Sequence, residues 1–171
     1  MRHLVHRFFG FIRARPLTPR EQMAVTTSLP APLHGLFYAQ AHEDQRHAFD
    51  VASRVGERPD LVVAALMHDV GKSVTRLGAV SRSAATTWAW TGLPVWGRWR
   101  TYLRHGPIGA AMLADAGAPM LAVAFAGQHP GPVPFGIDDG DWWLLAAADE
   151  ARSVPVKGTV PCRRANSMPP R

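Results

Sequence analysis

The chain has 171 residues, which is enough for one domain with a full hydrophobic core and too few for two large domains. Hydrophobic residues make up 47% of it and charged residues 19%, so a chain that is disordered throughout is excluded. No apolar run approaches the roughly 20 residues of a membrane-spanning helix. The single cysteine, Cys162, excludes an internal disulfide and a cysteine metal cage. Together with the missing signal-peptide cleavage site, these features predict a cytoplasmic protein.

The net charge of +6 is carried by the two ends of the chain. Residues 1–20 and residues 152–171 each contain five basic residues and no acid, so the middle, 21–151, has 9 bases, all 13 acids and a net charge of −4. This distribution argues against nucleic-acid binding by the folded body. The basic ends could contact RNA or an anionic membrane surface, or could serve only solubility.

Three regions are predicted along the chain. Residues 1–17 read as a basic amphipathic helix, which either packs its phenylalanine face on the body or makes weak contact with a membrane surface. Residues 18–151 form the folded domain, and residues 152–171, rich in proline and basic residues, are predicted to be a disordered tail. The oligomeric state cannot be predicted from the sequence.

Every apolar segment of the body has helical spacing, so the predicted class is all-α, with about six to eight helices. Four tryptophans at 88, 90, 96 and 99 fit helix packing better than a platform for stacking bases. The predicted helices, in chain order, are Pro19 to Ser28 capped by Thr18, Leu33 to Ala39, Glu43 to Val55, Leu61 to Val70 capped by Asp60, Ala79 to Trp90, Val95 to Leu103, Pro107 to Gly117, Pro119 to Pro130, and a last helix through Trp142, Leu145 and Asp149.

The pair His68-Asp69, followed by Gly71 and Lys72, is the most specific motif. An imidazole and a carboxylate at a helix end can turn toward one cation. A P-loop is excluded, because that motif needs a glycine where Leu66 stands. His47 shares a helix face with Val51 and Val55 at i+4 and i+8, so it is expected to point into the body.

Three further residues complete a set of four imidazoles and two carboxylates: His105, His129 and Asp149. Each also has an ordinary interpretation, as a helix cap, a loop residue and a solvated acid. As a set they suit a dinuclear centre of divalent ions such as Mn, Fe, Co, Mg or Zn.

The order of these residues resembles the HD-domain metal-dependent phosphohydrolase superfamily. The stretch "DQRHAFDVASRVGERPDLVVAALMHDVGKS" is similar to its central motif, and "RHGPIGAAMLADAGAP" is similar to the segment with its third metal histidine. The similarity covers about Leu33 to Ala151. It implies a single helical HD domain that cleaves a phosphate ester of a nucleotide or other small metabolite, either a monoester or a diester, with hydroxide activated by two divalent ions, Mn or Fe preferred.

The resemblance also implies individual roles. One ion is expected on His47, His68, Asp69 and Asp149, and Asp69 bridges to a second ion held by His105 and His129. Lys72 matches the position that contacts substrate phosphate in the HD-x-G-K branch, so Asp69 and Lys72 are the expected catalytic residues.

The cyclic-dinucleotide branch of the superfamily has a doubled histidine and a Gly-Tyr-Pro element, and both are missing here. Three alternatives stay open: a catalytically silent HD domain acting as a regulatory or partner-binding module, a metal pair used for oxygen chemistry, and an RNA-binding protein acting through its basic ends. His34 and His42 match no motif position and are candidates only for shaping the substrate pocket.

Overall fold

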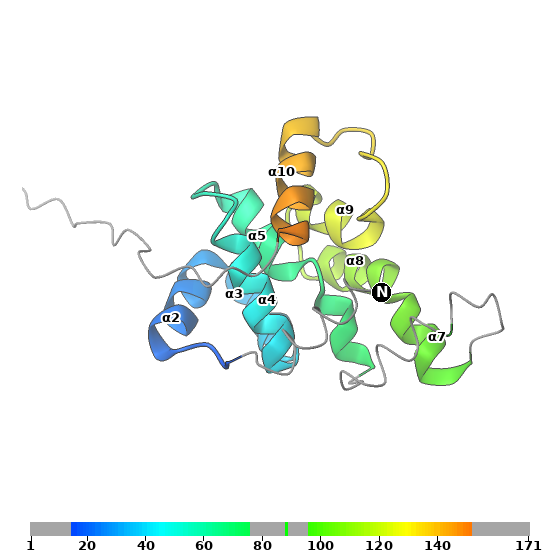
Figure 1. Cartoon of the computed structure of the whole chain (residues 1–171), viewed down its shortest axis with the longest axis horizontal. Coiled ribbons are helices and arrows are strands. Elements are labelled where there is room, and N and C mark those ends of the chain that lie inside the picture. Colours follow the sequence, from blue (N-terminus) through cyan, green and yellow to red (C-terminus); the bar gives the residue numbers. More distant parts are fainter. Residues whose placement is uncertain (1–14, 76–87, 89–95, 152–171) are drawn as a thin grey trace, which may run out of the picture.

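The computed structural model describes residues 15–75, 88 and 96–151, and Figure 1 shows their arrangement. Within these ranges the protein has eight α-helices, one 3-10 helix and no strand, which confirms the all-α prediction. The elements are α2 (Pro19–Ser28), α3 (Ala31–Tyr38), α4 (His42–Ala52), α5 (Pro59–Met67), the 3-10 helix η1 (Val70–Val74), α7 (Gly97–Leu103), α8 (His105–Asp115), α9 (Met120–Gln128) and α10 (Asp139–Glu150).

Some predictions fall outside the described residues. These are the N-terminal helix as far as residue 14, most of the predicted helix at 79–90, and the tail at 152–171. Every helix within the described ranges is too short or too polar to traverse a lipid bilayer.

Side-chain caps start two of the helices, and the sequence predicts the first of these caps. Thr18 caps α2 in a capping box: its side chain accepts from the Glu21 amide, and the Glu21 carboxylate accepts from the Thr18 amide at 2.7 Å. Asp138 caps α10 by accepting from the Asp141 amide at 2.9 Å. The prediction that Asp60 caps α5 is wrong. The cap is one position before Pro59, and Asp60 lies in the first turn, where its charge complements the helix dipole.

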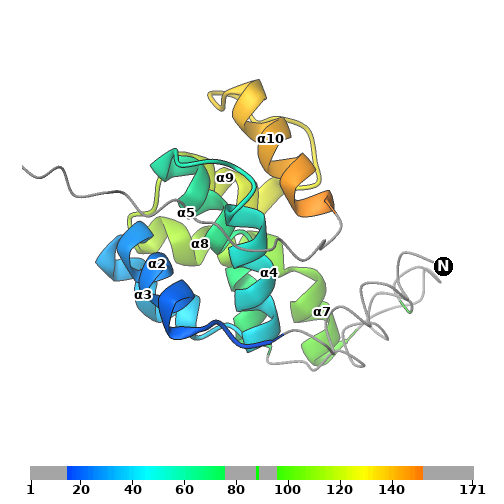
Figure 2. The same ribbon diagram turned by 60° about the vertical axis from the view of Figure 1, so that its left-hand side comes forward.

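Helix α5 is the centre of the core. Its residues 63 to 67 are all buried, and the helix packs against α4 on one side and α9 on the other. Helix α10 lies across α4 and α5, while α2 and α3 lie at one end of the molecule and α7 at the other (Figure 2). The elements that carry the predicted site residues therefore meet around the C-terminal end of α5.

A close backbone crossing sets the position of η1. Helix α5 ends at Met67 and not at Val70 as predicted, and the chain continues as η1 against α8. A Cβ atom on Gly71 would lie 2.0 Å from the carbonyl oxygen of His105 and 2.7 Å from the amide nitrogen of Gly109. Only glycine fits this crossing, so Gly71 is what lets the 68–72 segment reach α8.

Candidate metal centre

His68 and Asp69 lie where α5 ends and the backbone leaves α-helical geometry. His68 follows the last residue of α5, and Asp69 has φ −103° and ψ 8° before η1 begins. Both residues are buried, with 7% and 6% of their surface exposed. Their side chains turn into the interior together, and Nε2 of His68 lies 3.4 Å from Oδ2 of Asp69.

Backbone carbonyls orient two of the imidazole rings. Nδ1–H of His68 donates to the Ala65 carbonyl at 2.8 Å, and Nδ1–H of His105 donates to the Tyr102 carbonyl at 2.8 Å. A neutral ring held in this way presents the lone pair of Nε2 to the site, as metal-binding histidines do. Nε2 of His68 is buried and makes no hydrogen bond of normal geometry with any described residue. The site thus contains a buried ligand atom that a cation would satisfy.

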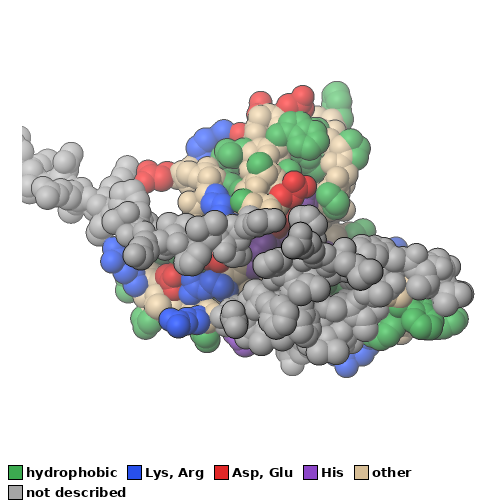
Figure 3. All heavy atoms as spheres, in the orientation of Figure 1, with side chains coloured by type: hydrophobic (Ala, Val, Ile, Leu, Met, Phe, Trp, Pro, Cys, Tyr) green, Lys and Arg blue, Asp and Glu red, His purple; other side chains and the backbone are tan. Residues whose placement is uncertain are grey.

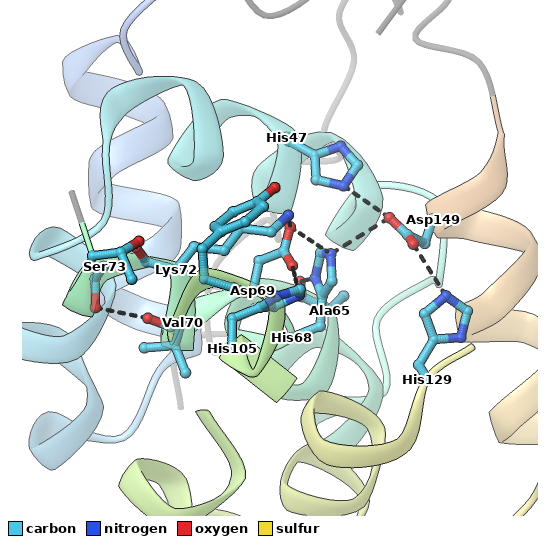
Figure 4. A network of polar contacts seen from close by, with 12 residues as sticks. His47, Ala65, His68, Asp69, Val70, Lys72, Ser73, His105, His129 and Asp149 are labelled. Carbon is cyan, nitrogen blue, oxygen red and sulfur yellow. Dashed lines mark hydrogen bonds and ion pairs between the residues drawn. The ribbon is translucent and has the colours of Figure 1, made fainter. Parts of the chain in front are cut away.

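The carboxylate of Asp149, on α10, gathers three imidazoles. Its Oδ1 lies 2.8 Å from Nε2 of His47 and 3.4 Å from Nε2 of His68, and its Oδ2 lies 3.2 Å from Nε2 of His129. His47 comes from α4, and His129 follows the last turn of α9, where its ring stacks on Phe125 at a centroid distance of 4.5 Å. Helices far apart in the sequence therefore meet at one carboxylate (Figure 4).

The two oxygens of Asp69 face different neighbours. Oδ2 faces His68 and accepts from the ammonium of Lys72, whereas Oδ1 lies 3.7 Å from Nε2 of His105, at the start of α8. Figure 4 shows Lys72 and His105 on one side of His68, and Asp149 with His129 on the other. A carboxylate placed in this way can be shared between two cations.

All seven residues singled out from the sequence lie in this one network of contacts. Their grouping differs from that implied by the resemblance in one respect: His129 contacts Asp149, where pairing with His105 around a second ion was expected. The stacking of His129 on Phe125 accounts for this, because it directs the ring toward α10.

The separations between ligand atoms suit a divalent ion. Ligands bound to one ion at about 2.1 Å lie about 3 to 3.4 Å apart in octahedral or tetrahedral geometry. The contacts of His47, His68 and His129 with Asp149, and of His68 with Asp69, span 2.8 to 3.4 Å. One ligand atom from each of His47, His68 and Asp69 also lies within 4.8 Å of the others. The donor set, imidazole nitrogen and carboxylate oxygen without thiolate, suits Mn, Fe, Co or Zn.

Electrostatics keep both carboxylates ionised. Burial opposes the charge of Asp69, but Lys72 and His68 hold the pKa of this carboxyl far below its usual range. Burial also opposes the charge of Asp149, but hydrogen bonds from His129 and His47, together with the nearby ring of His68, likewise hold its pKa far below normal. Burial lowers the pKa of His68, but Asp69 and Asp149 outweigh it and raise this pKa to about 9. Without a metal, Lys72 and the protonated ring of His68 balance these two negative charges, and a bound divalent ion would replace the Nε2 proton of His68.

The site opens to solvent beside two of its histidines. The side chains of His47 and His105 are 31% and 32% exposed, whereas that of Asp69 is 8% exposed. Histidine atoms are visible near the middle of the face drawn in Figure 3. Solvent therefore reaches the rings of His47, on α4, and of His105, at the start of α8.

Two residues near the site were not singled out from the sequence. Asp44 is buried one turn before His47 on α4. Burial lowers the pKa of Lys72, but the charge of Asp69, and to a smaller extent that of Asp44, raises it above its usual value. Tyr102 stacks on the ring of His105, with centroids 5.6 Å apart. An acid on the apolar face of α4 was an available signal for Asp44, whereas nothing marks Tyr102 within its arginine-rich helix.

The two other histidines considered lie away from the network. Nε2 of His34 contacts the carbonyl of Leu29, next to its own helix, and His42 is exposed beside Glu43. Neither contacts a site residue.

No protein-family model, curated protein or solved structure matches this chain.

Proposed function

We propose that this chain is a metal-dependent phosphohydrolase of the HD-domain type, which cleaves a phosphate ester of a small metabolite. The observation that carries the proposal is the convergence of four imidazoles, two ionised carboxylates and one ammonium group at the end of α5. Ligands drawn from α4, α8, α9 and α10 as well as the 68–72 segment make a chance grouping a poor explanation.

The chain's own residues would divide the work between holding ions and holding substrate. His47, His68, Asp69 and Asp149 would hold one divalent ion, with His129 beside it on Asp149, and Asp69 would share a second ion with His105. Two such ions supply a water of lowered pKa and neutralise charge on the phosphoryl oxygens. The carbonyls of Ala65 and Tyr102 would keep the two rings they contact in the orientation that binding needs.

Lys72 would bind the substrate phosphate. Its ammonium lies beside Asp69, and its side chain is 17% exposed, so part of it reaches solvent. Although burial opposes its charge, Asp69 and Asp44 raise the pKa of Lys72, so it stays cationic. A fixed cation next to the reacting phosphoryl group stabilises the charge that develops there during transfer.

The proposal is tested with the full chain loaded with Mn²⁺ and two probes, p-nitrophenyl phosphate for monoesters and bis-p-nitrophenyl phosphate for diesters. The decisive variant is His47→Ala, and its control is His42→Ala, an exposed histidine on the same helix. We expect His47→Ala to lose at least about 100-fold in rate on whichever probe is cleaved, since even outer partners of metal ligands contribute about 10-fold to 100-fold. His42→Ala should keep the wild-type rate.

Equal rates for wild type and His47→Ala, or a wild-type rate that does not change when the metal is removed, would contradict the proposal.

A further inference from the structure

Helix α7 has one face that is held against the body of the protein. The guanidinium of Arg98 donates to the carbonyl of Thr75, at the end of η1, and the ring of Tyr102 stacks on His105. Arg98 and Tyr102 are four residues apart and therefore lie on the same side of the helix. On the opposite side of α7, Arg100 and Leu103 are exposed.

This outer side carries large apolar groups. Trp99 and Leu103 lie four residues apart on one face of α7, and Trp96 immediately precedes the helix as its N-cap. Trp96 is 71% exposed and Leu103 is 38% exposed. The ring of Trp99 meets that of Trp88 edge to face at 6.4 Å, and Trp88 is itself 40% exposed. Apolar side chains gathered at the surface in this way are typical of an interaction site.

The same side is positively charged. Arg100 and Arg104 lie one position further round the helix than Trp99 and Leu103, and both are exposed. The sequence contains no aspartate or glutamate between Asp69 and Asp115, although the body as a whole is acidic. Figure 3 shows hydrophobic and basic side chains together at the right-hand end of the molecule, where α7 lies in Figure 1.

We propose that the outer face of α7, made up of Arg100 and Leu103 with the flanking residues Trp96 and Arg104, binds the surface of an anionic lipid bilayer. The indole of Trp96 would lie at the level of the lipid headgroups, and Arg100 and Arg104 would attract the anionic headgroups. Leu103 would enter the edge of the acyl layer. Because the inner face of α7 touches His105, binding in this way places the helix between the bilayer and the histidine-aspartate cluster.

The residue types favour a bilayer over a nucleic acid. Bases stack on aromatic rings whose faces are presented along the strand. The rings of Trp88 and Trp99 instead meet at an interplanar angle of 62°. Leu103 offers no ring for stacking, whereas an aliphatic side chain between indoles suits the boundary between headgroups and acyl chains.

The test is co-sedimentation of the full chain with vesicles of phosphatidylcholine alone and of phosphatidylcholine mixed with phosphatidylglycerol. The decisive variant is Trp96→Ser with Arg100→Glu. Its matched control is Trp143→Ser with Arg20→Glu, because Trp143 is 58% exposed on α10 and Arg20 is exposed on α2. The control measures what an exposed tryptophan and a basic residue contribute elsewhere on the chain.

We expect wild type to bind only the anionic vesicles, and binding to weaken as salt is added. The α7 variant should bind at least about tenfold more weakly. Each basic residue near an anionic surface increases the affinity by about tenfold, and replacing Arg100 with an acid also adds repulsion. The control should stay within about twofold of wild type. The single variant Arg104→Glu should also bind the anionic vesicles more weakly than wild type. It tests the same face if the double variant fails to fold.

Several results would overturn the proposal: equal binding to both kinds of vesicle, equal losses in the α7 variant and the control, or unchanged binding in the α7 variants. Binding of single-stranded RNA that is lost in the α7 variant, with no binding to anionic vesicles, would assign this face to nucleic acid.

Discussion

The crossing of η1 and α8 gives the sharpest test of how the fold positions the site. In Gly71→Ala, the added Cβ would lie 2.0 Å from the His105 carbonyl oxygen and 2.9 Å from its carbonyl carbon. Carbon and carbonyl oxygen come no closer than about 3.3 Å in favourable contacts. The two backbones must therefore separate by about 1 Å, which moves Asp69 and Lys72 relative to His105.

Overpacking of this kind costs about 1 to 3 kcal/mol of unfolding free energy. For a chain of this length, that predicts a melting temperature lower by roughly 2 to 4 °C for each kcal/mol. Misplacement of catalytic groups by about 1 Å costs about 100-fold in rate, so activity should fall much more than stability.

The matched control is Gly35→Ala, within α3. A Cβ at Gly35 meets nothing within 4 Å, so this variant should be slightly more stable than wild type, by about 0.4 to 1 kcal/mol. Gly109→Ala should fall between the two, since its Cβ would lie 3.1 Å from the amide nitrogen of Gly71. Thermal unfolding and phosphoester hydrolysis measure both effects. A melting temperature of Gly71→Ala at or above that of Gly35→Ala would contradict the predicted clash with α8.

Three further predictions follow from individual contacts. Lys72→Met should keep its metal content and lose about 100-fold or more in kcat, and loss of metal would contradict the role of this residue in substrate binding. The hydrogen bonds from Arg46 lower the pKa of Glu21 to about 2 from 4.5. That pair should stabilise the fold above pH 4.5 and lose its effect as the pH falls toward 2, so melting temperatures from about pH 6 to about pH 3 should fall more in wild type than in Glu21→Gln. Phe125 is fully buried and touches two histidines, so Phe125→Ala should cost about 3 to 5 kcal/mol in urea unfolding. Its control, Phe135→Ala at a fully exposed position, should stay within about 0.5 kcal/mol of wild type.

Helix starts could be predicted from the sequence where neighbouring residues determine them. Thr18 and Glu21 form a capping box that lies within four consecutive residues, and α2 begins there with Pro19. The end of α5 could not be predicted in the same way, because the apolar pattern continues to Val70. The close contact of Gly71 with α8, about 35 residues away in sequence, accompanies the change to a 3-10 helix, and no local signal encodes it.

In the candidate site, too, local features could be predicted from the sequence, whereas contacts between distant helices could not. The inward direction of His47 follows from the spacing of its own helix, and the His68-Asp69 pair is recognisable as two letters. Asp149 contacts all three of the imidazoles of His47, His68 and His129. These contacts depend on how α10 lies across α4. His47 and Asp149 are 102 residues apart, so only the tertiary arrangement could bring out this contact.

The metal content of the purified full chain tests the central proposal most directly. Mass spectrometry should be applied to wild type, Asp69→Ala and Asp115→Ala after incubation with Mn²⁺ or Fe²⁺, since Asp115 is an exposed carboxylate of α8 outside the site. We expect about two divalent ions per chain in wild type and Asp115→Ala, and almost none in Asp69→Ala. Metal-free wild type, or equal metal content in wild type and Asp69→Ala, would contradict a metal centre built on Asp69.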